Sequence, residues 1–210
     1  MNILLLVGTV LGVAALLGVA GLAAIGGATL RAVVLASLGA AVAALYGAGV
    51  LAVSLASREE TLPPGETKYF CGFYLDCHIG VAVLSDSTSS AIGARRAAGT
   101  FHVLTLRFSS SAVQATLAPY DVRLQLVGAD GARFERDRAA EEALGLGQPL
   151  ERDIPAGGEY RVRVVFDVPV SARGPRLFAD QGPPLKIPEV LLIGDEASLL
   201  HRKTLLALPG

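Results

Sequence analysis

The pattern of hydrophobic and polar positions divides the chain into two unlike parts. Residues 1–57 are apolar or small almost throughout, and Arg31 is their one charged side chain. Within this part, residues 3–25 and 32–56 each reach the roughly 20 apolar residues that a helix needs to cross a bilayer. The pattern therefore predicts a transmembrane hairpin of two helices, joined by a Gly-Gly turn.

Two other interpretations of the first apolar stretch stay open. A cleaved signal peptide has a basic start and an apolar core of about 7–15 residues. This chain starts with the uncharged Met1-Asn2 and stays apolar to Ile25. The second alternative is a soluble protein that buries both helices in its interior. We expect the retained membrane hairpin, because the apolar run is longer than a signal peptide requires.

Arg31 indicates how the hairpin is oriented. Lysine and arginine in short loops beside membrane helices favour the cytoplasmic side. The turn that carries Arg31 is therefore expected in the cytoplasm, although Arg58, just after the second helix, favours the opposite orientation. Arginine far outnumbers lysine, which is typical of a GC-rich bacterial genome. The expected location is the bacterial cytoplasmic membrane, crossed more than once, with the C-terminal domain in the periplasm.

Small residues recur at four-residue spacing in both apolar stretches. Such spacing forms a shallow ridge that lets helix backbones approach closely in lipid. An alanine-rich helix also shows part of this pattern through its composition alone. We expect a helix-packing ridge made of Gly8, Gly12, Ala32, Ala36, Ala40, Ala44, Ala48, Ala52 and Ala56.

The second part of the chain carries the pattern of a β-sandwich. A polar Pro-Pro-Gly linker over residues 58–66 separates it from the hairpin. Residues 67–194 then show short segments in which apolar and polar side chains alternate, which is typical of antiparallel sandwiches. The expected fold class is a membrane-anchored all-β protein, in which the hairpin precedes an immunoglobulin-like antiparallel β-sandwich and an amphipathic tail over residues 195–210.

The alternation also locates single elements. Asp130-Gly131 is a strong signal for a hairpin turn. In one segment Tyr160, Val162, Val164 and Phe166 are expected to face inward. Strands are expected at residues 99–108, 120–127, 158–169 and 189–194, and one short helix at residues 136–147.

A family resemblance covers residues 99–194. The motifs that carry it are Pro119, the Asp130-Gly131 turn, Gly157-Gly158 and Phe166-Asp167-Val168-Pro169. In their order and spacing they resemble the telokin-like immunoglobulin-fold domains of bacterial lipoproteins and membrane-anchored proteins. The resemblance implies a fold and an address outside the cytoplasm, and it implies no activity. The segment "RFSSSA" stands where that family usually has an asparagine-containing motif.

Cys71, Cys77 and His78 form the one stretch that concentrates reactive side chains. A disulfide between the two cysteines is favoured in an oxidising compartment, provided that the five residues between them fold back as a loop. Two free thiols, or a zinc or copper site made of Cys71, Cys77, His78 and His102, are the alternatives. Covalent haem attachment fits poorly, because five residues separate the cysteines instead of two.

These observations favour a non-catalytic protein. The serine-rich segments lack a Gly-x-Ser-x-Gly elbow, and the net charge of −1 gives no nucleic-acid footprint. We expect an accessory or stabilising subunit of a larger respiratory or photosynthetic membrane complex, with integral membrane proteins and the lipid bilayer as partners and no cofactor. The alternatives are a redox or metal-binding periplasmic module that uses Cys71, Cys77 and His78, and a free-standing envelope ligand binder or sensor.

Overall fold

The computed structural model describes residues 2–70, 77–146, 149–182 and 189–209. The chain forms two compact units. The hairpin unit comprises Met1–Arg58 and Leu185–Arg202, and the sandwich unit comprises Glu59–Pro184 and Lys203–Gly210.

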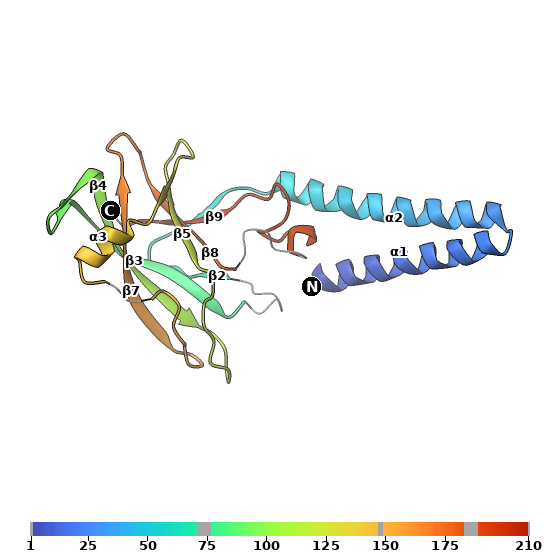
Figure 1. Ribbon diagram of the computed structural model, residues 1–210, viewed down its shortest axis with the longest axis horizontal. Helices are drawn as coiled ribbons and strands as arrows, with labels where there is room; N and C mark the ends of the chain where they lie inside the picture. Colours follow the sequence, from blue (N-terminus) through green and yellow to red (C-terminus); the bar gives the residue numbers. More distant parts are fainter. Residues whose placement is uncertain (1, 71–76, 147–148, 183–188, 210) are drawn as a thin grey trace. The chain divides into compact units, whose positions relative to one another are not determined.

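Two long helices form most of the hairpin unit and confirm the predicted pair. Helix α1 (Asn2–Ile25) and helix α2 (Thr29–Ala56) run antiparallel side by side (Figure 1). Gly27 adopts a left-handed φ of 78° between them, a conformation that commonly ends a helix and is easiest for glycine. Both helices are long and apolar enough to cross a membrane. The sequence pattern placed Arg31 in the turn between the two helices. Helix α2 begins at Thr29, so Arg31 lies instead in the first turn of α2.

In the part of the chain that the structure describes, nine strands form the two sheets of the sandwich unit, which Figure 1 shows. The four-stranded sheet has the order β2-β3-β4-β7, and the five-stranded sheet has the order β1-β9-β8-β5-β6. Among the described strands every pair is antiparallel except β1 with β9, which is parallel. The strands are β1 (Glu60–Leu62), β2 (Lys68–Phe70), β3 (Ile79–Ile92), β4 (Arg95–Ser110), β5 (Arg123–Val127), β6 (Arg133–Glu135), β7 (Glu159–Val168), β8 (Arg176–Asp180) and β9 (Thr204–Ala207).

One hydrophobic core joins the two sheets. Phe108 and Phe166 of the four-stranded sheet lie in the same buried cluster as Leu126 and Leu177 of the five-stranded sheet. The alternation predicted for β7 is confirmed up to Val164, because Val162 and Val164 are buried while Arg161 and Arg163 are exposed; Phe166 is buried as predicted, and Val165 beside it is buried as well. The chain is therefore a β-sandwich in this part, as its two-residue period indicates. The immunoglobulin-like class of that sandwich stays a prediction.

The motif Phe166-Asp167-Val168-Pro169 has a clear structural role. Asp167 accepts hydrogen bonds from the backbone N–H groups of Ala98 (2.7 Å) and Gly99 (3.0 Å) on β4. A Cβ atom at Gly99 would lie 2.1 Å from the carbonyl oxygen of Val168, so this position has no room for a side chain. The aspartate and the glycine together hold β4 close against the end of β7.

The short elements agree with the sequence pattern only in part. Asp130 and Gly131 form the turn between β5 and β6, with Gly131 at a φ of 82°. Helix α3 (Arg138–Ala143) lies within the predicted helical segment. The strand expected at residues 189–194 is wrong, because this segment begins with the 3₁₀ helix η1 (Glu189–Leu191) and continues in turns.

The carboxyl end also differs from the expectation. Residues 195–210 do not form a separate amphipathic tail, because β9 is the second strand of the five-stranded sheet and Leu205 and Leu206 are buried in it. The expected linker contributes strand β1, which pairs with β9. A short apolar run does not by itself distinguish a strand from other buried structure. The pairing of β1 with β9 joins residues about 140 positions apart, so no local pattern indicates it.

Candidate functional site

The contact between α1 and α2 is formed by positions that lie three or four residues apart. Along each helix the less exposed positions recur at these steps, with a mean of about 3.3 residues on α1 and about 3.7 on α2, close to the 3.5 of a coiled-coil seam. Near the middle, Leu16 and Leu17 of α1 approach Gly39 of α2. The seam positions are Ile3, Leu6, Thr9, Val13, Leu16, Ala20 and Ala23 on α1, and Ala32, Leu35, Gly39, Val42, Tyr46, Val50 and Ser54 on α2.

The predicted small-residue ridge does not form this seam. A Cβ atom at Gly8 or Gly12 would have nothing within 4 Å. Of the alanines, Ala32 and Ala36 are half-buried, whereas those from Ala40 to Ala56 are exposed. Four residues advance a helix by one turn plus about 40°, so a strict four-residue ridge winds around α2 and leaves the face that contacts a straight neighbour.

An engineered crosslink tests the seam. A Cβ atom at Gly39 would lie 3.6 Å from the Cβ atom of Leu16, which is within the range that a disulfide requires. With Cys71 and Cys77 replaced by serine, the pair Leu16→Cys and Gly39→Cys should oxidise almost completely, as measured by the gel shift of a maleimide reagent. The matched pair Gly12→Cys and Gly39→Cys should stay reduced. Equal oxidation of both pairs would contradict the seam.

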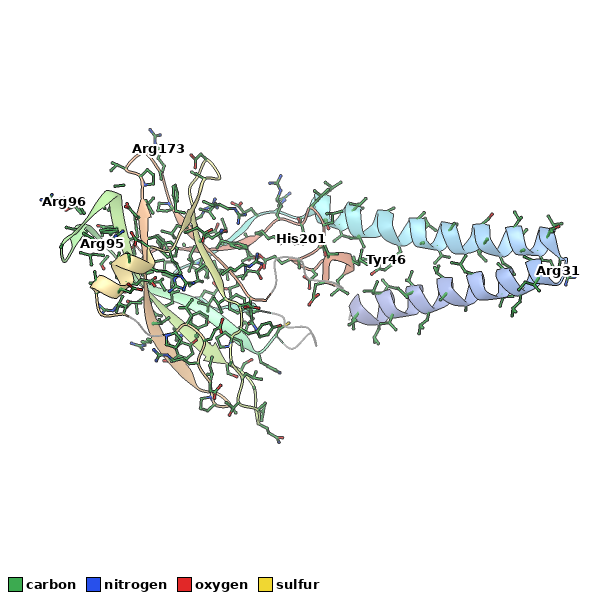
Figure 2. The ribbon with its side chains drawn as sticks, viewed as in Figure 1. Arg31, Tyr46, Arg95, Arg96, Arg173 and His201 are labelled. Carbon is green, nitrogen blue, oxygen red and sulfur yellow. The ribbon has the colours of Figure 1, made fainter. Side chains whose placement is uncertain are left out.

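The outward faces of the hairpin are strongly hydrophobic. Leu4 and Leu45 are each 74% exposed, and other large aliphatic side chains are exposed along both helices. Arg31 is the one charged residue described in either helix (Figure 2). Contiguous apolar surface of this extent marks contact with lipid or with another apolar protein surface. The faces of α1 and α2 that point away from the seam are therefore a candidate interaction surface.

The cysteine stretch lies at one end of the four-stranded sheet. Phe70 on β2 pairs with Ile79 on β3, so the chain reverses direction between them and a continuous strand from Tyr69 is excluded. Cys71 lies outside the described residues, and Cys77 is exposed. The disulfide between these cysteines therefore stays a prediction.

The two histidines of the candidate metal site are far apart. His78 precedes β3, and its Nδ1 lies 2.9 Å from the Ser111 hydroxyl. His102 pairs in register with Thr88, nine residues along β3 from Ile79, which corresponds to about 30 Å of strand. Within the described part of the chain, no three histidine, cysteine or acidic side chains form a cluster that could hold a metal. The four-ligand set that includes His102 is therefore wrong.

His102 instead pairs with an acidic neighbour. Its Nδ1 lies 2.8 Å from Oδ2 of Asp86, and the two side chains are 15% and 8% exposed. The Oδ1 atom of Asp86 is buried without a hydrogen-bond partner among the described residues. The pair joins β3 to β4, and we assign it a structural role.

Helix α3 is fastened to the edge of the four-stranded sheet by an ion pair that the sequence pattern did not indicate. The Arg136 guanidinium donates to both carboxylate oxygens of Glu141, at 3.0 and 2.6 Å. Oε1 of Glu141 also accepts the backbone N–H of Val165 on β7 at 3.0 Å. Because β7 is an edge strand, this contact satisfies a backbone N–H group that would otherwise be open to pairing with another chain.

The start of α3 carries a second polar contact. Asp137 accepts the backbone N–H of Ala140 at 2.8 Å as a helix cap and pairs with Arg95 at 2.9 Å. Burial alone would raise the pKa of Asp137, but the backbone N–H of Ala140 and the Arg95 guanidinium lower this pKa below its ordinary value. The cap and the ion pair join α3 to the β3–β4 hairpin, whose end carries Arg95 and Arg96 (Figure 2).

A cavity of about 410 Å³ lies beside α3. Its described lining mixes acidic and basic side chains with aliphatic ones, and it includes the paired Arg136 and Glu141. Nearby, the Tyr160 hydroxyl donates to the carbonyl oxygen of Leu150, and burial raises the pKa of Tyr160 to about 12. Among the described lining residues there is no serine, cysteine or histidine, and the titratable side chains are three glutamates and two arginines.

Comparison with known proteins adds limited information. No protein-family model and no curated protein match the chain. A secreted protein of Mycobacterium tuberculosis, MPT63, is similar in structure with 16% identity and a TM-score of 0.43, covering 61% of this chain and 93% of that chain. A conserved hypothetical protein of Bacillus anthracis has 11% identity and a TM-score of 0.37, covering 54% of this chain and 90% of that chain. The resemblance to telokin-like domains stays a prediction, and function must be inferred from this chain's own residues.

Proposed function

We propose that this protein is a non-catalytic accessory subunit of a larger bacterial membrane complex, respiratory or photosynthetic. In this proposal both helices cross the cytoplasmic membrane, and the sandwich unit lies in the periplasm, where it contacts the exposed part of the complex. The single observation that carries the proposal is the apolar surface of the hairpin, which faces outward all along α1 and α2.

The physical argument starts from the cost of leaving that surface in water. Each fully exposed leucine or valine side chain forgoes about 1.5–3 kcal/mol of burial, and such side chains recur along both helices. A bilayer removes this cost without any change in the hairpin. Each helix also satisfies its own backbone hydrogen bonds, which a segment in the hydrocarbon region must do.

A partner protein is favoured by the shape of α2. The alanines from Ala40 to Ala56 are exposed outside the seam with α1, and Ala44 and Ala48 lie about one turn apart on the same side of α2. Within lipid, small residues allow a second helix to approach closely, and close van der Waals packing drives association there. We therefore assign Ala44 and Ala48 to the contact with a helix of the partner complex.

Native gel migration after gentle detergent extraction tests the proposal. The chain has a mass of 21.6 kDa, and we expect it to migrate in a much larger band whose other members mass spectrometry identifies as integral membrane proteins. Introducing bulk with Ala44→Leu and Ala48→Leu should release the chain from that band. The control Leu45→Ala, on a larger exposed residue between them, should leave the band intact.

Migration of the unaltered chain on its own would overturn the accessory-subunit proposal. That result would favour a free-standing envelope binder or sensor.

A further inference from the structure

Part of the chain between β8 and β9 belongs to the hairpin unit and contacts the C-terminal part of α2. We call residues 189–202 the collar segment. The Tyr46 hydroxyl donates a 2.8 Å hydrogen bond to the carbonyl oxygen of Leu191, and the Ile193 side chain lies beside Gly49. At its end, the backbone N–H of Arg202 donates to the Ser57 hydroxyl at 2.8 Å. Figure 2 shows Tyr46 and His201 on these two facing parts of the hairpin unit.

The collar segment has a defined internal structure. The Ser198 hydroxyl donates to the carbonyl oxygen of Leu192, and both residues are buried. The backbone N–H of Leu199 donates to the carbonyl oxygen of Val190 at 3.2 Å, which closes the loop. Leu200 adopts a left-handed φ of 64°, a conformation that costs a residue other than glycine about 1–3 kcal/mol.

This closed loop leaves three leucines exposed. Leu191, Leu199 and Leu200 are 48%, 55% and 60% exposed, although Leu192 between them in sequence is 1% exposed. A loop in water gains nothing from a strained backbone that presents leucine side chains outward. The same arrangement is favourable when the side chains enter an apolar phase, where each is worth about 1.5–3 kcal/mol of burial.

The position of these leucines along α2 identifies that phase. A rise of about 1.5 Å per residue makes the 28 residues of α2 about 42 Å long, whereas the hydrocarbon core is about 30 Å thick. If Arg31 marks one edge of that core, the other edge lies about 20 residues further on, near Leu51. Tyr46 then lies below the edge and Ser57 above it, so the collar segment crosses the edge.

The position of Tyr46 also supports placing the edge of the hydrocarbon core near this part of α2. It is the one aromatic residue in residues 1–57, and tyrosine is enriched where the hydrocarbon core meets the headgroups. Its hydroxyl reaches a backbone carbonyl group of the collar segment. A carbonyl group near the hydrocarbon edge needs such a donor, because water is scarce there.

We propose that the collar segment inserts Leu191, Leu199 and Leu200 into the periplasmic edge of the bilayer that surrounds the hairpin. This inference rests on the proposed membrane location of α1 and α2. Within the collar segment the acidic Glu189, Asp195 and Glu196 outnumber the basic Arg202, so the segment has no net positive charge to attract anionic headgroups. Insertion therefore depends on apolar contact and not on charged headgroups, and it is insensitive to salt.

Single tryptophans provide the test, because the chain has none of its own. The full chain is reconstituted in phosphatidylcholine vesicles whose acyl chains carry bromine, a quencher of tryptophan emission on contact, near the headgroup in one preparation and at mid-chain in another. Leu199→Trp and, independently, Leu200→Trp should each lose most of their emission, equally at low and high salt. Val170→Trp, at a position 82% exposed in the sandwich unit, should keep its emission.

A tryptophan in the helix separates failure of the inference from failure of the proposed function. Leu45→Trp, on the outward face of α2, should be quenched whenever the hairpin is in lipid. Quenching at position 45 without quenching at positions 199 and 200 would overturn the insertion of the collar segment and leave the membrane hairpin standing. Emission that persists at position 45 would overturn the membrane hairpin itself. Quenching at position 199 that disappears at high salt would contradict apolar insertion.

Discussion

Replacement of Glu141 by alanine should lower the free energy of unfolding of the sandwich unit by about 3–5 kcal/mol. The Glu141 side chain is 9% exposed and holds Arg136 through two hydrogen bonds. It also accepts the backbone N–H of Val165. Alanine removes all three acceptor contacts and leaves a poorly solvated guanidinium and a buried N–H without their partner. Denaturant unfolding of the full chain in detergent, followed by the circular dichroism of its strands, measures the loss.

The partner residue provides the matched control. Arg136→Ala should also destabilise the unit, because it leaves the Glu141 carboxylate buried without its cation. The double variant Arg136→Met with Glu141→Leu should cost less than the sum of the two alanine changes, since it removes both charges and keeps apolar volume. A change within about 0.5 kcal/mol for Glu141→Ala, as expected of a surface residue, would contradict the role of this ion pair.

Phe166→Ala should destabilise the sandwich unit by about 3–5 kcal/mol, which is a large part of the total for a domain of this size. Phe166 has no solvent exposure and packs in the cluster shared by both sheets. Removing the ring loses the free energy gained by burying it. It also leaves a cavity that cannot collapse completely, because β7 is held in register by its pairing with β4. The same unfolding measurement detects the change.

Val170 is the control for Phe166, because it lies four residues further along the chain and is 82% exposed. Val170→Ala should change the free energy of unfolding by less than about 0.5 kcal/mol. Phe166→Leu should lie between the two, since leucine fills part of the same space. Equal effects of Phe166→Ala and Val170→Ala would show that the core is not at Phe166.

Local periodicity was sufficient to predict the parts of the fold that it governs directly. The uninterrupted apolar runs predicted α1 and α2, and alternation predicted the inward side chains of β7. Local periodicity was insufficient where the structure depends on pairing between strands that are far apart in the sequence. Strand β9 is made of only four residues and depends on β1, which lies about 140 residues earlier. The segment after residue 188 has the composition of a strand, but the first residues described there form the 3₁₀ helix η1.

The candidate interaction surfaces were predicted less completely than the elements. Counting every fourth residue found Ala32 of the seam but missed Gly39, because the seam advances by three residues as well as by four. The contact of Glu141 with Val165 joins residues 24 positions apart, and no local pattern contains it. The contact of Tyr46 with Leu191 spans 145 positions. Such pairs require the assembled chain.

The central claim is that lipid surrounds α1 and α2, and alkaline carbonate extraction of membranes from cells that express the full chain tests it most directly. Carbonate at high pH releases proteins held by charge or by other proteins and leaves those whose apolar helices lie in the bilayer. We expect the intact 21.6 kDa chain to stay in the membrane pellet. Its release into the supernatant would contradict the membrane hairpin.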